Sequence, residues 1–494
     1  MSLTADTRDL LTAALQLYAG DPVATTRLTD VQSRLEAPLR VAIAGKVKAG
    51  KSTLLNALVG ERLAPTDEGE CTRVVTWYKD GHTYQVLAFL DDSHGEQLRF
   101  SREDHHLEID LDGRDPLSIE HLEVTWPSSS LRATTLIDTP GIGSLSTEIA
   151  EQTSRFLAPD DDVTKADAVI YMMKHLHAND VAFLEAFHDT AVAQPNPVNA
   201  IAVLSRADEI GVGRLDSMGS ASKIAKRYSR DPNVRRLVQT VVPIAGLLAE
   251  TGTTLTEDEF RLIKTLAALP SKEIDALLLS ADRFVNAATQ TGLTDLERGH
   301  LLDRFGVFGV RLCTTLTRRD AAKTASDLAA ALEERSGLND LRAILSSLFV
   351  ARSDHLKSRS AILALDDLLR TRPVAGGDTL SLEVERVMAS AHPFAELRVL
   401  SAVRSGWVSG KPEQLAELER IIGAEGTDPH MRVGLPADAD SSSVLAAAQE
   451  TLVRWQRRAE NPMTGHELAV ASRVAIRSCE EILATGANAH DPRS

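Results

Sequence analysis

Apolar residues follow two different spacings along the chain, and the changes of spacing divide it into three parts. Residues 7–36 carry apolar stripes at helical spacing on both sides of a break at Gly20-Asp21-Pro22. From Arg40 onward, short apolar runs of strand length alternate with helical segments, and after about Thr254 only helical spacing remains. We therefore expect N-terminal neck helices in 1–37, an α/β domain in 38–250 and helical neck and trunk segments in 251–494.

The middle part is predicted to be a doubly wound α/β domain with a mixed sheet. Its expected strands are RVAIAG, CTRVVTWYK, YQVLAFL, IEHLEVTWP, ATTLIDTPG, ADAVIYMM, VNAIAVLSRAD and TVVPIAG. The runs ADAVIYMM and VNAIAVLSRAD are almost entirely apolar, which is typical of strands in the buried middle of a parallel sheet.

The last part is predicted to be an elongated all-helical bundle. Apolar residues recur at helical spacing through 338–371, which predicts helix there; an unbroken helix of that span would be about 50 Å long. Further helices are expected near 379–404, 412–423, 441–460 and 464–484, with a loop over 426–443.

Composition and charge narrow the possible partners. The chain has 494 residues, only 4% of them aromatic, and a formal net charge of -16. General attraction to polyanions is unfavourable at this charge, so we expect no nucleic-acid partner and only local basic contacts with lipid. Cys71, Cys313 and Cys479 lie far apart without metal-site spacing, which favours a reducing cytoplasm. No apolar run reaches the ~18 residues of a membrane-spanning helix, so any contact with a membrane is expected at its surface.

A phosphate-binding loop follows the first predicted strand of the α/β domain. Gly45 to Ser52 has the pattern G-x-x-x-x-G-K-S, with a strand before it and a helix after it. The glycines allow backbone N–H groups to approach an anion, and the helix directs its positive end at the phosphates. Lys51 is expected to reach the β- and γ-phosphates, and the Ser52 hydroxyl to ligate Mg²⁺. The predicted nucleotide-binding residues of this segment are Gly45, Lys46, Val47, Lys48, Ala49, Gly50, Lys51, Ser52 and Thr53.

Two later motifs stand at the ends of predicted strands. In LIDTPG, Asp138 is expected to hold the metal through water, and Gly141 to offer its N–H to the γ-phosphate. In Ser205-Arg206-Ala207-Asp208, the Asp208 carboxylate can accept from N1–H and the exocyclic amine of guanine, which predicts GTP. The alternative for Asp208 is a capping role at the strand end. A weaker base contact is expected in VPIAG, at Ala245.

A threonine that senses the γ-phosphate through Mg²⁺ is still needed. The candidates are Thr66, Thr72 and Thr76, and we prefer Thr72 as catalytic and metal-binding residue because it precedes a predicted strand. The alternative is an ordinary surface threonine.

The set GKVKAGKS, CTR, DTPGIG and SRAD, on a domain flanked by helices, resembles the dynamin superfamily, and within it the bacterial dynamin-like proteins. The resemblance implies an Mg²⁺-dependent GTPase that binds GTP and GDP, dimerises through its G domains, and remodels an anionic phospholipid membrane through a helical tip. It also implies a peripheral location on the inner face of the plasma membrane, and a related dynamin-like protein as a candidate partner.

Lys48 departs from the family pattern. Val47 and Lys48 stand where eukaryotic dynamins have Gln and Ser, and guanylate-binding relatives carry a cis arginine finger at the position of Lys48. We expect Lys48 to supply positive charge in the transition state. The alternatives are that Lys48 steadies only the ground-state phosphates, or that it is solvated.

Two loops between the C-terminal helices are candidates for the lipid-contacting tip. The loop 370–378 places Arg370 and Arg372 beside Pro373 and Val374, and the loop 404–411 carries Trp407. Apolar residues flanked by cations suit an anionic lipid surface. For each loop the alternative is an ordinary turn between helices.

Two other functions remain open at this point. A regulatory or assembly GTPase would use the same helices to bind a protein partner without remodelling lipid. An ATPase is the third alternative, and the substitution Asp208→Asn tests it, because a guanine-reading Asp would then shift its preference toward xanthine nucleotides.

Overall fold

A computed structural model of the chain describes most of its 494 residues. The described residues are 3–65, 74–90, 95–103, 106–141, 166–175, 181, 184, 199–210, 214–287, 291–404 and 406–488. The candidate threonines Thr66 and Thr72 and the cysteine Cys71 lie outside them. Among the described helices, none is long and apolar enough to cross a membrane.

The α/β domain is built on a mixed sheet, as the sequence predicts. In the described part of the chain the sheet has nine strands in the order β11-β10-β9-β1-β8-β2-β7-β3-β4. The strands are β1 (Leu39–Gly45), β2 (Thr76–Asp80), β3 (Gln85–Phe89), β4 (Gly95–Gln97), β7 (His121–Trp126), β8 (Thr134–Asp138), β9 (Ala168–Met173), β10 (Ala200–Leu204) and β11 (Val241–Pro243). The five strands from β11 to β8 pair in parallel, whereas β2 runs antiparallel to β8. A separate hairpin is formed by β5 (Arg99–Glu103) and β6 (His106–Asp110).

Two strands in the parallel part of the sheet are completely buried. Every residue of β9 and β10 is buried, as expected for parallel strands covered on both faces. The register pairs Ile43 of β1 with Asp138 of β8, and Gly45 with Met172 of β9. The ends of these three strands therefore meet at one edge of the sheet, where α/β folds bind their ligands.

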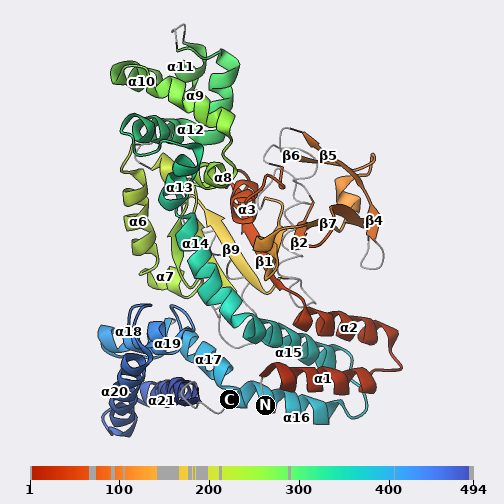
Figure 1. Cartoon of the computed structure of the whole chain (residues 1–494). Helices are drawn as coiled ribbons and strands as arrows, with labels where there is room; N and C mark the ends of the chain where they lie inside the picture. Colours follow the sequence, from red (N-terminus) through yellow and green to blue (C-terminus); the bar gives the residue numbers. More distant parts are fainter. Residues whose placement is uncertain are drawn as a thin grey trace.

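Four described helices accompany the sheet: α3 (Lys51–Val59), α6 (Ser217–Tyr228), α7 (Pro232–Arg235) and α8 (Gly246–Thr254). Helix α8 packs against α3 and against α13 (Ala325–Ser336) (Figure 1). The expected domain boundary at residue 250 falls inside α8.

Helices α9 (Glu257–Ala267), α10 (Ser271–Leu277), α11 (Ala281–Asn286) and α12 (Asp295–Arg318) form a helical region with its own core around Phe284, Leu301 and Phe305. Reciprocal hydrogen bonds between Thr256 and Glu259 cap the start of α9. Helix α12 contains one non-helical residue, Gly306, with φ 63°. This region lies on the opposite side of the α/β domain from the N-terminal helices and from the helices after residue 352 (Figure 1), a separation that the helical spacing did not predict.

The segment 338–371 is helical, as predicted, but it is not one continuous α-helix. Helix α14 (Leu338–Ile344) is followed by five residues of π-helix (Leu345–Phe349) and a 3-10 turn (Val350–Arg352) before α15 (Ser353–Thr371). At this break the buried guanidinium of Arg352 donates to the backbone carbonyls of Ile422 and Gly423. Such departures from α geometry mark places where tertiary contacts outweigh helical propensity.

The N-terminal helices α1 (Leu3–Leu17) and α2 (Pro22–Glu36) are confirmed, with Asp21 capping α2. They pack against α15 and α16 (Gly377–Ser390), which cover their apolar stripes. We call α1, α2, α15 and α16 the first bundle (Figure 1).

The second bundle contains α17 (His392–Arg404), α18 (Pro412–Ile421), α19 (Pro429–Val433), α20 (Ser441–Glu460) and α21 (His466–Asn488). Two sequence predictions fail here. The expected helix near 379–404 is divided at Ala391, and the expected loop over 426–443 contains the short helix α19.

Candidate nucleotide site

The phosphate-binding loop connects β1 to α3 at the edge of the sheet where the parallel strands end. Gly45 has φ 151°, and a Cβ there would lie 2.5 Å from the carbonyl oxygen of Met172, so a side chain is excluded. The loop then closes with a hydrogen bond from Ala49 N to Lys46 O (3.1 Å), and Gly50 precedes the first turn of α3.

Lys51 lies at the start of α3 and folds back over the loop. Its Nζ is 3.4 Å from the carbonyl oxygens of both Gly45 and Lys46. Burial lowers the pKa of Lys51, and the nearby Asp138 carboxylate opposes this shift. A desolvated ammonium held above the loop is suited to bind phosphate oxygens.

Ser52 and Asp138 meet at the N-terminus of α3. The Ser52 hydroxyl donates to Asp138 Oδ2 at 2.8 Å, although the two residues are 86 positions apart. Asp138 Oδ1 is buried and has no hydrogen-bond partner among the described residues. Desolvation raises the pKa of Asp138, while Lys51 and the bond from Ser52 act in the opposite direction. A hydroxyl oxygen beside a carboxylate with one unused oxygen fits a hard divalent cation such as Mg²⁺.

The DTPG turn is hydrogen-bonded to β1 and approaches the phosphate-binding loop closely. Thr139 donates to Ile43 O from its backbone N (3.3 Å) and from its hydroxyl (2.9 Å). A Cβ on Gly141 would lie 2.8 Å from Val47 Cα, so only glycine allows this approach. The turn therefore reaches the phosphate-binding loop, as the prediction for Gly141 requires.

On the predicted base-binding side, Ser205 and Asp208 are buried. Desolvation raises the pKa of Asp208. The Ser205 hydroxyl has no hydrogen-bond partner within the described part of the chain. Ala245 N donates to Ser336 O (2.9 Å), and Ala207 N donates to Ile244 O (3.1 Å), so the two base-side motifs lie together.

Arg206 connects the base side of the site to the phosphate-binding loop. This residue has φ 52°, and its guanidinium donates to Lys48 O (3.1 Å) and to Glu209 Oε1 (2.6 Å). The side chains of Val47 and Lys48 are exposed, Lys46 is half-buried, and Ala49 is buried. The residues predicted on both sides of the nucleotide are thus brought to one place, apart from Thr72, which stays a prediction.

Thr76, the alternative to Thr72, belongs to β2. Its side chain is buried, and its hydroxyl donates to Val74 O at 3.3 Å. The backbone register places Thr76 opposite Asp138.

The loop 370–378 closes one end of the first bundle. Arg372 forms an ion pair with Asp21 (2.6 Å), and Arg370 with Asp367 (3.0 Å). Tyr18 also donates from its hydroxyl to Arg372 O (2.6 Å). The two arginines therefore face carboxylates of the same bundle, while Pro373 is exposed and Val374 is half-buried.

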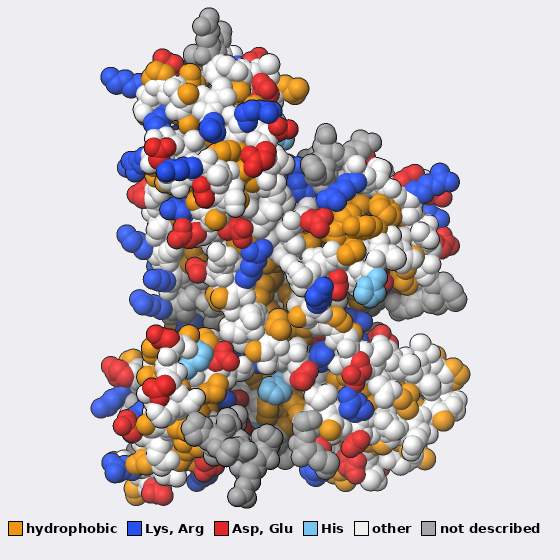
Figure 2. Space-filling model, viewed as in Figure 1, with side chains coloured by type: hydrophobic (Ala, Val, Ile, Leu, Met, Phe, Trp, Pro, Cys, Tyr) orange, Lys and Arg blue, Asp and Glu red, His pale blue; other side chains and the backbone are white. Residues whose placement is uncertain are grey.

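The loop 404–411 belongs to the second bundle. Trp407 is 65% exposed, whereas the neighbouring Val408 and Arg404 are buried, so this loop presents neither a second apolar side chain nor this arginine at the surface. On the face shown in Figure 2, basic and acidic side chains alternate over both bundles and do not form one continuous basic patch.

Sequence reasoning missed one buried polar residue next to the site. Asn56 of α3 is completely buried and bonds to Glu250 of α8, 194 positions away. The available signal was a single polar residue inside the apolar run LLNALV.

Comparisons with known proteins find relatives of this chain. A family model described as the dynamin family matches residues 41–191. The isoniazid-induced protein IniC of Mycobacterium tuberculosis is 39% identical over 503 aligned residues, covering 98% of this chain and 99% of that protein. A bacterial dynamin-like protein of Nostoc punctiforme is 32% identical over 21% of this chain and 16% of its own length. A solved structure of an oligomerised bacterial dynamin pair aligns with 98% of this chain and 74% of that chain, at 14% identity and a TM-score of 0.32.

Proposed function

The chain belongs to the dynamin family of GTPases, and on this premise we propose that it couples Mg²⁺-dependent GTP hydrolysis to remodelling of a membrane. The observation that carries the nucleotide half is the contact between Ser52 and Asp138 at the N-terminus of α3. We place the lipid contact on the first and second bundles, which lie on the opposite side of the α/β domain, here called the G domain, from helices α9–α12 (Figure 1).

The phosphates are bound by the loop from Gly45 to Gly50 and by Lys51. Ser52 would hold Mg²⁺ directly, and Asp138, with its unused Oδ1, would hold it through water. When bound, the cation neutralises charge that develops on the transferred phosphoryl group. Thr72 is proposed as the second protein ligand, and Gly141 as the backbone donor to the γ-phosphate.

The base is read by Asp208, with Ser205, Arg206 and Ala245 around it. Burial strengthens the hydrogen bonds that a carboxylate makes to the guanine N1–H and amine. In Asp208→Asn, turnover should shift from GTP toward xanthosine triphosphate by about tenfold or more. Equal use of ATP by the wild-type protein would contradict a guanine-specific site.

The lipid contact is proposed at Trp407 and at the loop 370–378, with the protein peripheral on the inner face of the plasma membrane. An exposed tryptophan suits the interface between lipid headgroups and acyl chains. Nucleotide-dependent association would then bring membrane-bound copies together. It would occur between the G domains of two copies of this chain, or between this chain and a related dynamin-like protein.

One observation favours the alternative of an assembly GTPase that binds a protein partner. Arg370 and Arg372 are paired with Asp367 and Asp21, which weakens the attraction of their loop to anionic lipid. Under this alternative the loop 370–378 and the turn before α2 would form part of a protein interface.

The decisive experiment measures GTP turnover with and without anionic liposomes, together with flotation of the protein. We expect liposomes to stimulate turnover, and Trp407→Ser to reduce flotation several-fold. The double variant Arg370→Glu/Arg372→Glu tests the other loop, and Arg319→Glu, an exposed arginine at the end of α12, is the matched control. Turnover without any affinity for vesicles would support the assembly GTPase.

A further inference from the structure

The buried amide of Asn56 has all of its hydrogen-bonding capacity satisfied. Its Oδ1 accepts from the backbone N–H groups of Leu63 (2.9 Å) and Ala64 (2.7 Å). Its Nδ2 donates to Ala64 O (3.0 Å) and to Glu250 Oε1 (3.0 Å). An asparagine amide offers two donors and an oxygen with two lone pairs, so the site uses every one of them.

Asn56 follows Ser52 by four residues, about one helical turn, on α3. Its orientation therefore depends on the same helix whose N-terminus carries Lys51 and Ser52. Three of the hydrogen bonds of Asn56 go to Leu63 and Ala64, just after the end of α3. A rotation or sliding of α3 against α8 therefore strains the fourth, the bond to Glu250.

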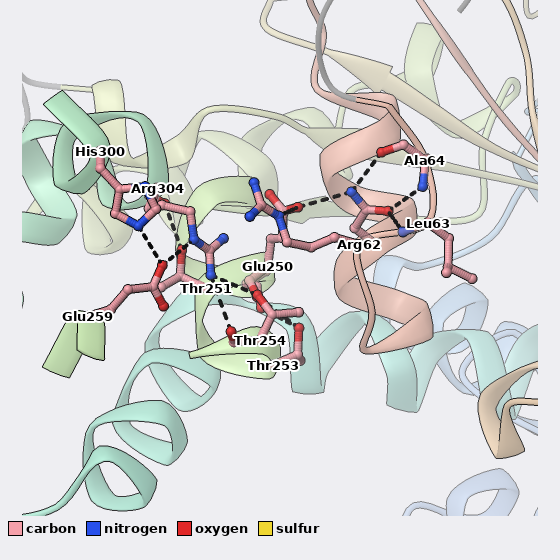
Figure 3. Close-up of polar contacts among 12 residues, drawn as sticks. Arg62, Leu63, Ala64, Glu250, Thr251, Thr253, Thr254, Glu259, His300 and Arg304 are labelled. Carbon is pink, nitrogen blue, oxygen red and sulfur yellow. Dashed lines mark hydrogen bonds and ion pairs between the residues drawn. The ribbon is translucent and has the colours of Figure 1, made fainter. Parts of the chain in front are cut away.

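Glu250 links this helix to α8. The carboxylate is 3% exposed, and Arg62 Nε lies 3.6 Å from its Oε1 (Figure 3). Helix α8 begins directly after Ala245, the predicted base contact, and a Cβ on Gly246 would lie 3.5 Å from Thr53 Cγ2. Helices α3 and α8 therefore meet near the nucleotide through Thr53 and Gly246, and one turn further on through Asn56 and Glu250.

The same stretch of α8 contacts the helical region beyond it. Thr251 donates from its hydroxyl to Arg304 O (2.6 Å), and Arg304 donates to Thr254 Oγ1 (2.9 Å) and Glu259 Oε1 (2.6 Å) (Figure 3). Arg304 lies two residues before the non-helical Gly306 of α12. Glu250 thus lies on α8 between the contact of α8 with α3 and its contact with Arg304 of α12.

We propose that Asn56 and Glu250 are a positioning pair for GTP hydrolysis, which sets the register of the phosphate-binding helix α3 against α8. The proposal rests on the proposed GTPase function, and neither residue is placed in contact with the nucleotide. Apolar packing between two helices is non-directional, whereas a hydrogen bond weakens steeply when its angle changes. A buried carboxylate paired with an amide therefore specifies one relative position of α3 and α8.

The test exchanges the donor and the acceptor across the pair. In Asn56→Asp, two carboxylates face each other and both Nδ2 donors are lost, so kcat/KM for GTP should fall by about tenfold or more. In Glu250→Gln, the amide oxygen can still accept from Asn56, and the loss should be about threefold or less. In the double variant Asn56→Asp/Glu250→Gln, the amide introduced on α8 can donate to the carboxylate introduced on α3, while the bond to Ala64 O stays lost. The kcat/KM should therefore rise several-fold above that of Asn56→Asp without reaching that of wild type.

Each variant is assayed well below its own melting temperature, with kcat and KM for GTP and the Kd of GDP determined separately. Simple loss of stability would lower the active fraction and leave KM and Kd unchanged, whereas displacement of α3 would change KM for GTP and the Kd of GDP. Asn339→Asp, on the exposed face of α14, adds the same charge outside the pair and should match wild type.

If Asn56→Asp fails to fold, Glu250→Asp replaces it. That substitution keeps the charge but shortens the reach to Asn56, so it should lower kcat/KM more than Glu250→Gln does. Wild-type kinetics in folded Asn56→Asp or in Glu250→Asp, or a double variant no better than Asn56→Asp, would overturn the positioning pair. A wild-type protein that hydrolyses no GTP would instead contradict the proposed function.

Discussion

At the scale of single residues, two non-glycine residues in left-handed conformation join the halves of the nucleotide site. Lys48 has φ 61° and Arg206 has φ 52°, and the Arg206 guanidinium donates to Lys48 O. Left-handed non-glycine residues cost about 1–3 kcal/mol and persist where surrounding contacts hold them. The backbone of Lys48 is thus fixed from the base side, while its side chain is exposed.

Replacing Lys48 tests its proposed role in the transition state. Lys48→Asn removes the charge and keeps a residue type that tolerates the left-handed conformation. We expect turnover to fall roughly 10- to 100-fold with a smaller change in GTP affinity, because a lysine finger contributes less than an arginine finger. Lys226→Asn, which removes the same charge at an exposed position of α6, is the control. Turnover equal to wild type in Lys48→Asn would leave Lys48 without a catalytic role.

At the scale of elements, helices α9 and α12 are held together by a buried ion pair. Glu259 accepts from Arg304 (2.6 Å), lies 3.3 Å from His300, and also caps the start of α9 through Thr256. Desolvation raises the pKa of Glu259, but the hydrogen bonds from His300 and Arg304 outweigh it and bring the pKa down to about 2. The ionised carboxylate is therefore part of the folded arrangement of this helical region.

Acid should loosen the α9–α12 region through this carboxylate. Because the pKa of Glu259 is lower in the folded than in the unfolded chain, its contribution is complete above about pH 4.5 and is lost as the pH falls toward 2. The loss should be on the order of 3 kcal/mol in the free energy of unfolding. Between pH 6 and pH 3, the melting temperature should fall less steeply with pH in Glu259→Gln than in wild type. Glu334→Gln, an exposed glutamate on α13, should leave the slope unchanged.

At the scale of the whole molecule, the second bundle contacts the G domain through an ion-pair cluster. Arg235 of α7 pairs with Glu419 of α18, and Arg404 Nε of α17 lies 3.6 Å from the other oxygen of Glu419. Arg404 is buried, so its pair with Glu419 belongs to the bundle interior, whereas Arg235 reaches in from the G domain.

Removing the contribution of Arg235 should loosen the contact between the second bundle and the G domain without unfolding the bundle. Arg235→Gln leaves the pair between Glu419 and Arg404 intact, and a half-exposed ion pair contributes about 0.2–1 kcal/mol. Hydrogen exchange of α18 amides should accelerate about two- to fivefold, and X-ray scattering should show a larger radius of gyration. Arg230→Gln, an exposed arginine before α7, serves as the control. If the exchange rates and the scattering profile both match wild type, Arg235 does not hold the bundle.

The sequence by itself determined the elements whose signals are local. The phosphate-binding loop, the apolar runs that became β9 and β10, and the break between α1 and α2 follow from a few neighbouring residues. The placement of Asp138 and Asp208 also follows, because the carboxyl ends of parallel strands meet at one edge of a sheet.

Only the tertiary structure decided which distant groups meet. The break between α14 and α15 depends on Arg352 reaching the end of α18, and the charge of Arg372 is balanced by Asp21 from the other end of the sequence. Helical spacing likewise could not place α9–α12 on the far side of the G domain, or join Asn56 to Glu250. Periodicity reports which face of an element is apolar, whereas the partner of a buried charge or amide is set by long-range packing, which no local pattern records.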